Sequence, residues 1–271
     1  MSPNQLTDSD FSRLSGLVHD LTGVTVDGTK RSMLSSRIRR RLRALELDTF
    51  HEYIQRLASG DMDAAEIEVF IQTVTTHTTS FFRTPSVWDF LENEFRSERF
   101  EGREVAAWSA ASSTGQEPFS LAMLLRAARG QDPRGGRWSV TASDVSALTV
   151  EQARAGRFER EDVEAADAAR PRLDVLGGFG LDGEAAVAKR ELASAIAFRT
   201  HNLLDPMQGR FDAVLLRNVI IYFSEADTQR VIDHATAAIR PGGLLVIGEA
   251  ESLVARGGGL EFEAPCIYRK K

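Results

Sequence analysis

The chain has 271 residues, of which 42% are hydrophobic and 27% charged, and its formal net charge is −6. This composition is that of an ordinary soluble globular protein, and the length suits two modest domains or one large one. No apolar stretch approaches the roughly 20 residues of a membrane helix, and Met1–Gln5 carries no basic or apolar part of a signal peptide. Cys266 is the only cysteine, which excludes an intrachain disulfide and a thiolate metal cluster. We therefore expect a cytoplasmic protein.

The net charge hides a local basic segment. Between Lys30 and Arg43 there are seven basic residues and no acidic one. That segment carries +7, which leaves −13 for the rest of the chain. A basic segment on an acidic protein favours an acidic partner and argues against general binding to nucleic acid.

The first ~95 residues show the periodicity of helices. A sequence resembling a capping box, Thr7–Asp10, precedes the first apolar stripe, and Gly23 can end that helix. A second, basic helix is predicted over Thr29–Glu46 from one apolar stripe at helical spacing: Leu34, Ile38, Leu42 and Leu45. We expect this stripe to be buried and the outer arginines to stay in solvent, namely Arg37, Arg40, Arg41 and Arg43. Further helices are predicted over Phe50–Ala58, over Ala64–Thr75 and from Pro85 onward.

From Val105 onward, predicted strands alternate with predicted helices. The strands are Val105–Trp108, Trp138–Ala142, Ile196–Thr200, Phe211–Leu216 and Leu244–Gly248. The helices are Pro118–Arg129, Ala147–Ala155 and Glu225–Ile239. This alternation predicts an α/β fold with a largely parallel sheet covered by helices. The glycine-rich stretch Val175–Arg199 breaks the pattern, and we expect it to form a small β insertion.

The segment Trp108–Ser120 is the most informative part of the chain. Small residues and Gly115 follow an apolar strand, and Glu117 then starts a helix. Backbone N–H groups can approach a ligand closely in such a turn, which in an open α/β sheet lies where cofactors bind. Asp144 ends the next apolar run, where an acid can hold a ribose. The pattern indicates a nucleotide-like cofactor; the alternative is an ordinary strand–helix turn with Asp144 as a helix N-cap.

Two further segments combine polar and aromatic residues. In Thr75–Arg83, threonines and a histidine precede two phenylalanines and an arginine that can bind an anion. In Phe211–Phe223, an apolar strand runs directly into Arg217, at the end where side chains point into the ligand crevice. The alternatives are a linker whose phenylalanines fill a core, and an Arg217 that pairs with a surface acid beside a core Tyr222.

Taken together, these segments resemble the CheR family of bacterial chemotaxis-receptor methyltransferases, which use S-adenosylmethionine to esterify receptor glutamates. The family's motifs are matched in order by Thr75–Arg83, Trp108–Ser120, Asp144, Asn202–Leu204, Arg217–Phe223, Pro241–Gly248 and Glu249–Ser252. The resemblance implies the Rossmann-like fold of class I S-adenosylmethionine-dependent methyltransferases. It also implies an all-helical N-terminal domain over residues 1–83. The methyltransferase domain would cover 84–271, with a small antiparallel β subdomain at about 172–199.

The resemblance also implies roles for individual residues. S-adenosylmethionine, or its product S-adenosylhomocysteine, would be bound by His77, Thr79, Arg83, Glu117, Asp144, Asn202, Leu203, Leu216 and Arg217. The catalytic end of the site, nearest the transferred methyl group, would be formed by Arg83, Arg217 and Tyr222. No metal is implied. The chain departs from the family at His77, which replaces an asparagine, and at Thr84, Gln116 and Phe119.

Partners are implied in the same way. The basic helix Lys30 to Arg43 would dock on the acidic helical cytoplasmic domain of a chemoreceptor. The turn Gly178–Gly180 in the β insertion is a candidate site for a receptor's C-terminal peptide. We expect a monomer without membrane insertion, and no nucleic-acid substrate, because the Asn/Asp-Pro-Pro-aromatic motif of base methylation is absent. The alternatives are a solvated arginine face, a methyltransferase of small molecules, and a non-catalytic cofactor-binding or scaffold module of the same fold.

Overall fold

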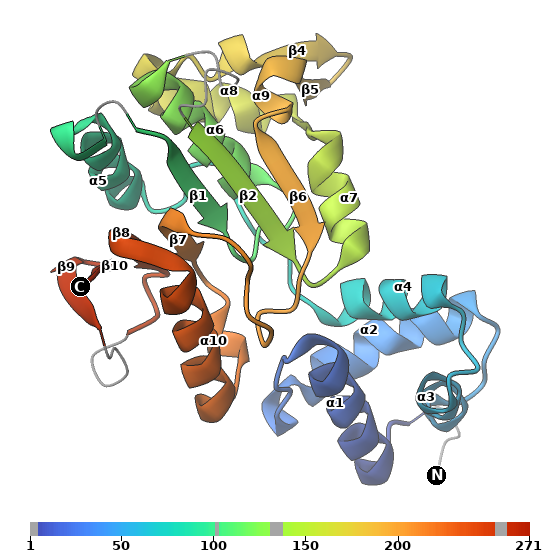
Figure 1. Cartoon of the computed structure of the whole chain (residues 1–271). Helices are drawn as coiled ribbons and strands as arrows, with labels where there is room; N and C mark the ends of the chain where they lie inside the picture. Colours follow the sequence, from blue (N-terminus) through green and yellow to red (C-terminus); the bar gives the residue numbers. More distant parts are fainter. Residues whose placement is uncertain (1–4, 101–102, 131–137, 253–258) are drawn as a thin grey trace. The chain divides into compact units, whose positions relative to one another are not determined.

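The computed structural model describes residues 5–100, 103–130, 138–252 and 259–271. It divides the chain into two compact units (Figure 1). The helical unit contains Met1–Thr76 and Tyr222–Thr228, and the sheet unit contains His77–Ile221 and Gln229–Lys271. The division falls before His77, upstream of the predicted boundary after Arg83. Among the described residues, no helix is both long enough and apolar enough to cross a membrane.

The helical unit is built from α1 (Asp8–Thr22), α2 (Arg31–Ala44), α3 (Phe50–Ser59) and α4 (Ala64–Val74). The predicted ends of α1 are confirmed, because the Thr7 hydroxyl accepts the Asp10 N–H and Gly23 adopts φ 76° after the last turn. The predicted second helix is shorter than expected, since Gly28–Lys30 forms a 3₁₀ turn before α2. The apolar stripe of α2 is buried as predicted at Leu34, Ile38 and Leu42.

Two of the four arginines expected in solvent are instead bonded within the helical unit, so that expectation was wrong for them. Arg37 donates to the carbonyls of Thr73, Val74 and Thr75 at 3.2, 3.2 and 2.7 Å. It thereby satisfies carbonyl groups that the C-terminus of α4 leaves without helical partners. Arg41 donates through Nε to buried Glu66 at 2.8 Å. Arg40 and Arg43 are exposed, as expected.

The sheet unit contains a seven-stranded sheet in the order β6-β2-β1-β7-β8-β10-β9. Its strands are β1 (Val105–Ser109), β2 (Trp138–Asp144), β6 (Ile196–Thr200), β7 (Phe211–Leu216), β8 (Ile239–Ile247), β9 (Leu260–Ala264) and β10 (Ile267–Lys270). The first five strands in the order are parallel, and β10 runs antiparallel to β8 and β9. All five predicted strands are present, and the predicted α/β fold is confirmed.

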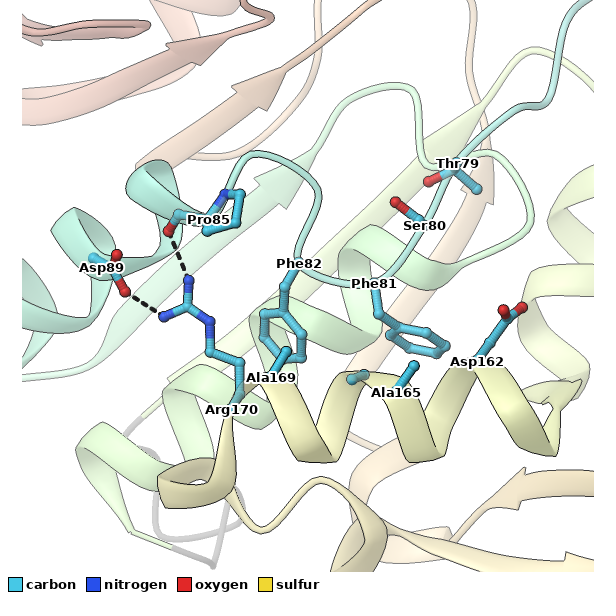
Figure 2. Close-up of a pocket in the computed structure, with 11 residues that line it drawn as sticks. Thr79, Ser80, Phe81, Phe82, Pro85, Asp89, Asp162, Ala165, Ala169 and Arg170 are labelled. Carbon is cyan, nitrogen blue, oxygen red and sulfur yellow. Dashed lines mark hydrogen bonds and ion pairs between the residues drawn. The ribbon is translucent and has the colours of Figure 1, made fainter.

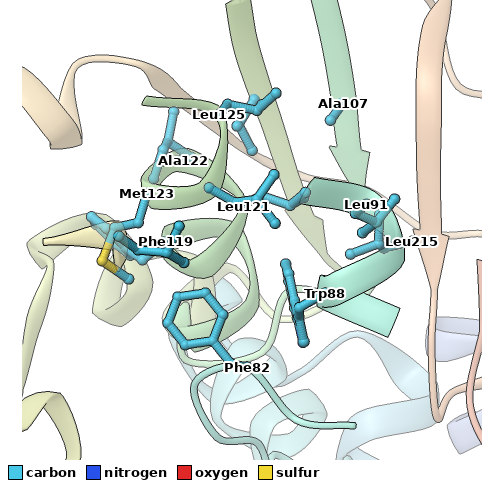
Figure 3. Packing of buried hydrophobic residues seen from close by; sticks show 14 of the residues in the cluster. Phe82, Trp88, Leu91, Ala107, Phe119, Leu121, Ala122, Met123, Leu125 and Leu215 are labelled. Carbon is cyan, nitrogen blue, oxygen red and sulfur yellow. The ribbon is translucent and has the colours of Figure 1, made fainter. Parts of the chain in front are cut away.

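Helices pack along this sheet (Figure 1). They are α5 (Pro85–Arg96), α6 (Gln116–Arg129), α7 (Ala147–Ala155) and α10 (Glu225–Ala238). Figure 3 shows the buried contacts between α5, α6 and the strands, with Phe82, Trp88, Phe119 and Leu121 among them. Because this core anchors the start of α5 and α6, it also fixes the segments that precede both helices.

The β insertion is a three-stranded antiparallel sheet, β3-β5-β4. Its strands are β3 (Arg157–Glu159), β4 (Phe179–Asp182) and β5 (Ala185–Ala188), and α8 (Arg160–Ala169) follows β3. The insertion therefore begins before the predicted residue 172. The predicted turn at Gly178–Gly180 is not a turn: Gly178 ends a 3₁₀ helix, whereas Phe179 and Gly180 lie in β4. The hairpin turns at Gly183 instead, which has φ 61°.

Candidate functional site

The polar residues singled out in the sequence follow strands that end at one edge of the sheet. Ser109 ends β1 and Asp144 ends β2, while Arg217 directly follows β7 and Asn202 lies just beyond β6. These four strands are parallel neighbours, so their carboxyl ends share one edge. In open α/β sheets this edge is where ligands bind.

The turn after β1 is tied to the end of β2 through Asp144. Its carboxylate accepts hydrogen bonds from the backbone N–H groups of Ser113 at 2.9 Å and Ser146 at 3.1 Å. The N-cap of α7 is Ser146, whose hydroxyl accepts from Thr149, so Asp144 is not the cap that the alternative required. Burial raises the pKa of Asp144, although the backbone donors oppose that shift.

The same turn needs glycine at position 115. Gly115 has φ 104°, and a side-chain carbon there would lie 3.1 Å from the Cβ of Ala153 on α7. Ser113 also has a positive φ of 49°. This backbone brings N–H groups and small side chains, rather than bulky ones, to the carboxyl edge of the sheet.

Glu117 and Arg217 form a buried ion pair at this edge. Arg217 Nη1 donates to Glu117 Oε2 at 3.1 Å, and the Ser109 hydroxyl donates to Glu117 Oε1 at 2.7 Å. The side chain of Arg217 is 2% exposed and that of Glu117 is 12% exposed. Burial raises the pKa of Glu117, against the opposing effect of Arg217 and Ser109. Arg217 thus pairs with Glu117, and the alternative that it pairs with a surface acid is wrong.

Three buried polar atoms at this edge have no hydrogen-bond partner among the described residues. They are Nε of Arg217, the hydroxyl oxygen of Ser112 and Nε2 of His201, which follows β6. A buried donor without a partner carries a free-energy cost, and such atoms mark places where a ligand or water completes the hydrogen bonding. The residues present therefore fit a polar cofactor with several hydrogen-bonding groups.

The segment before α5 is held against the turn that follows β1. The Ser113 hydroxyl donates to the His77 carbonyl at 2.9 Å, and the Phe82 N–H donates to the Ser120 hydroxyl at 3.1 Å. Phe82 is buried, and Phe81 packs edge-on against Phe158 at 4.9 Å. The phenylalanines do fill a core, as the alternative proposed, and by doing so they fix a polar segment beside Glu117 and Asp144.

Three further predicted residues lie on neighbouring segments of the sheet unit: Asn202, Leu203 and Leu216. Asn202 accepts from the Leu204 N–H at 3.0 Å, and Leu203 and Leu216 are buried. Tyr222 is different, because it belongs to the helical unit. There its carbonyl accepts from the Thr25 N–H at 2.8 Å, and Lys30 Nζ lies 5.3 Å from its ring centre. Arg83 and Arg217 thus come together within one unit, whereas Tyr222 belongs to the other.

Sequence reasoning assigned no role to Glu251, which fixes the segment after β7. Its carboxylate accepts from the N–H groups of Asn218 at 3.0 Å, Gly248 at 2.6 Å and Ile220 at 3.0 Å. Asn218 has φ 56°, a conformation that needs such support. The Glu249–Ser252 motif match was the signal that could have identified it.

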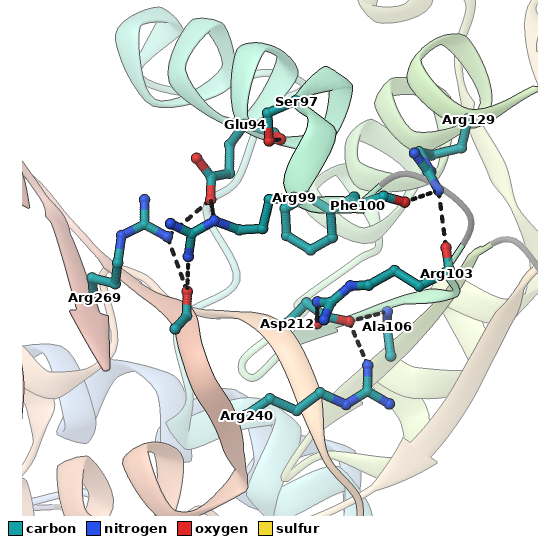
Figure 4. Close-up of polar contacts among 11 residues, drawn as sticks. Glu94, Ser97, Arg99, Phe100, Arg103, Ala106, Arg129, Asp212, Arg240 and Arg269 are labelled. Carbon is teal, nitrogen blue, oxygen red and sulfur yellow. Dashed lines mark hydrogen bonds and ion pairs between the residues drawn. The ribbon is translucent and has the colours of Figure 1, made fainter. Parts of the chain in front are cut away.

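A cavity and a cluster of ion pairs in the sheet unit lie apart from these pairings. A cavity of about 470 Å³ lies between the segment before α5 and α8 (Figure 2). Its wall includes Phe81, Phe82 and alanines of α8, and of the predicted cofactor residues only Thr79 lines it. At the amino ends of β1 and β7, buried Asp212 pairs with Arg103 and Arg240 (Figure 4). The contacts around Asp212 join neighbouring strands and are structural.

Two family models match the chain. Residues 9–75 match "CheR methyltransferase, all-alpha domain", and residues 77–263 match "CheR methyltransferase, SAM binding domain". The chain is 34% identical over 250 residues to the chemotaxis protein methyltransferase of Salmonella typhimurium, covering 91% of this chain and 85% of that protein. It is 34% identical over 252 residues to chemotaxis protein methyltransferase 2 of Pseudomonas aeruginosa, covering 92% and 88%.

Two solved methyltransferase structures are similar to parts of the chain. SAM-bound CalS10, an amino pentose methyltransferase from Micromonospora echinaspora, is 14% identical with a TM-score of 0.37, covering 75% of this chain and 65% of that one. An O-methyltransferase family protein from Burkholderia thailandensis is 21% identical with a TM-score of 0.34, covering 59% and 37%.

Proposed function

The chain belongs to the CheR methyltransferase family, and from this premise we propose that it methylates glutamate side chains of chemoreceptors. S-adenosylmethionine is its cofactor, since residues 77–263 match the SAM-binding domain of the family. The observation that carries the proposal is the buried Arg217–Glu117 pair beside Asp144, at the carboxyl edge of the sheet. The relatives are named as chemotaxis methyltransferases, so a non-catalytic module is not favoured.

The proposed cofactor site is made of residues from four strand ends and the segment before α5. Its members are His77, Thr79, Arg83, Glu117, Asp144, Asn202, Leu203, Leu216 and Arg217. When bound, S-adenosylmethionine supplies a methyl group on a positively charged sulfonium. The carboxylates of Glu117 and Asp144 would meet polar groups of its methionine and adenosine parts. The unpartnered Nε of Arg217 and hydroxyl of Ser112 support a ligand with many polar groups.

A glutamate substrate explains why the site needs no general base. The reference pKa of a glutamate carboxyl is about 4.3, so the carboxylate is already an anionic nucleophile at neutral pH. A carboxylate oxygen would bond the methyl carbon as the bond from that carbon to the sulfonium sulfur breaks, so neutral S-adenosylhomocysteine would leave and both charges would be lost. The protein then has to align the two groups and keep water away from the carboxylate.

The three proposed catalytic residues differ in their surroundings. Arg83 has an exposed side chain, which can reach an approaching carboxylate. Arg217 is buried, and its terminal nitrogens already bond Glu117 and the carbonyl of Arg83. We assign Arg217 the task of orienting those two groups. Tyr222 is proposed as the third catalytic residue from its place in the family motif Arg217–Phe223 alone.

The exposed arginines of α2 form the proposed docking surface for the receptor. Arg39, Arg40 and Arg43 are exposed, and Arg39 lies over the ring of Phe50 at 6.0 Å. An acidic helical substrate complements their charge, which chiefly accelerates association. Arg37 and Arg41 are not included, because they bond groups of the helical unit. A receptor C-terminal peptide at the β insertion is a second proposed contact, and it rests on the family resemblance alone.

The proposal is tested by incubating the protein with S-adenosylmethionine labelled on the methyl group and membranes rich in chemoreceptor. Carboxyl methyl esters release their label as methanol in base, whereas methylated nitrogens do not. We expect base-labile label on the receptor band, and much less with Glu117→Ala or Arg83→Ala protein. Base-stable label, or label on no receptor, would contradict the proposal.

A further inference from the structure

We propose that Trp88 is a positioning residue for methyl transfer: its indole fixes the main chain of Arg83 and thereby directs the Arg83 side chain. The inference rests on the proposed function, in which Arg83 contacts cofactor and substrate. Trp88 lies in the first turn of α5. Nothing in its sequence position indicates a role beyond the core, where it is fully buried.

The backbone on both sides of Arg83 is in an unfavourable conformation. Phe82 has φ 49° and Thr84 has φ 63°. Residues with a side chain seldom adopt this left-handed region, and they stay there only when surrounding contacts hold them. Two such residues flanking one arginine give its side chain a direction that a relaxed segment would not keep.

The contacts that hold this segment converge on the Arg83 carbonyl. It accepts hydrogen bonds from the Trp88 indole N–H at 2.9 Å and from Arg217 Nη2 at 2.7 Å. The Phe82 N–H, one residue earlier, donates to the Ser120 hydroxyl at 3.1 Å. The main chain is therefore bonded on both sides of Arg83, while the Arg83 side chain remains exposed.

Trp88 contacts Phe82, Arg83 and Arg217. Besides its bond to Arg83, its ring packs edge-on against Phe82 at 5.4 Å (Figure 3). The guanidinium of Arg217 lies 5.9 Å from its ring centre. Arg217 in turn bonds Glu117. The indole thus links the strained segment to the ion pair of the cofactor site.

The Trp88→Phe substitution keeps an aromatic ring and removes the N–H donor. Phenylalanine is also smaller than tryptophan, so this variant loses some packing as well, and the control variant below loses a similar amount at another buried tryptophan. We expect the dissociation constant of S-adenosylhomocysteine to rise about 3- to 10-fold, the range for one lost neutral hydrogen bond. If Trp88 acts through Arg83, the same substitution in an Arg83→Ala protein should change the constant less than about 2-fold, since coupled residues are not additive. Titration calorimetry measures the dissociation constant for the parent protein, the Trp88→Phe and Arg83→Ala variants, and the double variant. Thermal melting follows the stability of all four.

Trp138→Phe is the matched control. Trp138 is also buried, and its indole donates to a main-chain carbonyl, that of Gly130 at 3.1 Å, but it starts β2 rather than lying near a carboxyl end. It should leave S-adenosylhomocysteine affinity at the parental value. If Trp88→Phe does not fold, Ser120→Ala tests the same segment, with the same expected dependence on Arg83.

Three results would overturn the positioning role: parental affinity in a folded Trp88→Phe protein, an equal loss in both Arg83 backgrounds, or an equal loss in Trp138→Phe. A failure of the proposed function gives a different result, because the parent protein would then leave receptor glutamates unmethylated, whereas these binding constants are measured without receptor.

Discussion

The Glu117→Gln substitution tests the polar cluster at the carboxyl ends of β1 and β7. Both carboxylate oxygens of Glu117 accept hydrogen bonds, from the Ser109 hydroxyl at 2.7 Å and from Arg217 Nη1 at 3.1 Å. Glutamine keeps the size of the side chain, but it has only one oxygen, and its amide nitrogen only donates. One donor therefore loses its acceptor, and Arg217 loses its counter-charge at a buried position. Hydrogen bonds to charged groups contribute about 1.5–3 kcal/mol each.

We expect this loss to raise the dissociation constant of S-adenosylhomocysteine about 10- to 150-fold, since 1.4 kcal/mol corresponds to a factor of ten. Titration calorimetry at neutral pH measures the constant, and thermal melting verifies that the variant is folded. Glu94→Gln is the matched control: its side chain is 13% exposed and bonds Arg269 at 2.9 Å, away from the cofactor edge (Figure 4). Parental S-adenosylhomocysteine affinity in Glu117→Gln, or an equal loss of affinity in Glu94→Gln, would refute the assignment of Glu117 to the cofactor site.

Acidification should weaken S-adenosylhomocysteine binding already at a pH above the ordinary pKa of a glutamate carboxyl, because burial raises the pKa of Glu117 and a neutral carboxyl cannot pair with the ligand's ammonium group. A Glu117→Gln protein with the same pH profile would contradict this. Replacing exposed Arg40 and Arg43 by glutamate should raise the KM for receptor at low salt, with less effect at physiological ionic strength, where the Debye length is about 8 Å. Calorimetry should give parental S-adenosylhomocysteine affinity, and an unchanged KM would mean a merely solvated face. Arg41→Ala should instead destabilise the protein by about 1.5–3 kcal/mol in denaturant unfolding, because buried Glu66 loses its cation. Parental stability would refute that role.

The strands that sequence analysis found and those it missed differ in polarity. Among the five predicted strands, β1, β7 and the second half of β8 are mostly apolar and buried, a pattern typical of a parallel sheet, whereas the edge strand β6 has exposed residues. In β9 and β10, by contrast, charged and apolar residues mix, and Phe262 is the most exposed large hydrophobic residue described. The three-residue strand β3 is too short for any periodicity. These strands depend on pairing with a neighbour, which no local pattern reveals.

The site was predicted better as a set of residues than as a set of contacts. Motif matches named Glu117, Asp144 and Arg217, and the structure places each at the expected edge of the sheet. Their hydrogen bonds join residues far apart in sequence, so spacing could not predict them. The same limit explains Arg37 and Arg41: helical periodicity placed them on a polar face, but it could not show that α4 presents carbonyls and a buried acid to that face.

The claim that this chain forms methyl esters on receptor glutamates is tested most directly by locating the added methyl groups. A chemoreceptor cytoplasmic domain is incubated with the protein and S-adenosylmethionine, digested, and mapped by tandem mass spectrometry. We predict methyl groups on glutamate side chains, removed by mild base, and none when S-adenosylmethionine is replaced by S-adenosylhomocysteine. Methyl groups on lysine or arginine, or an unmodified receptor beside a protein that binds the cofactor, would contradict the claim.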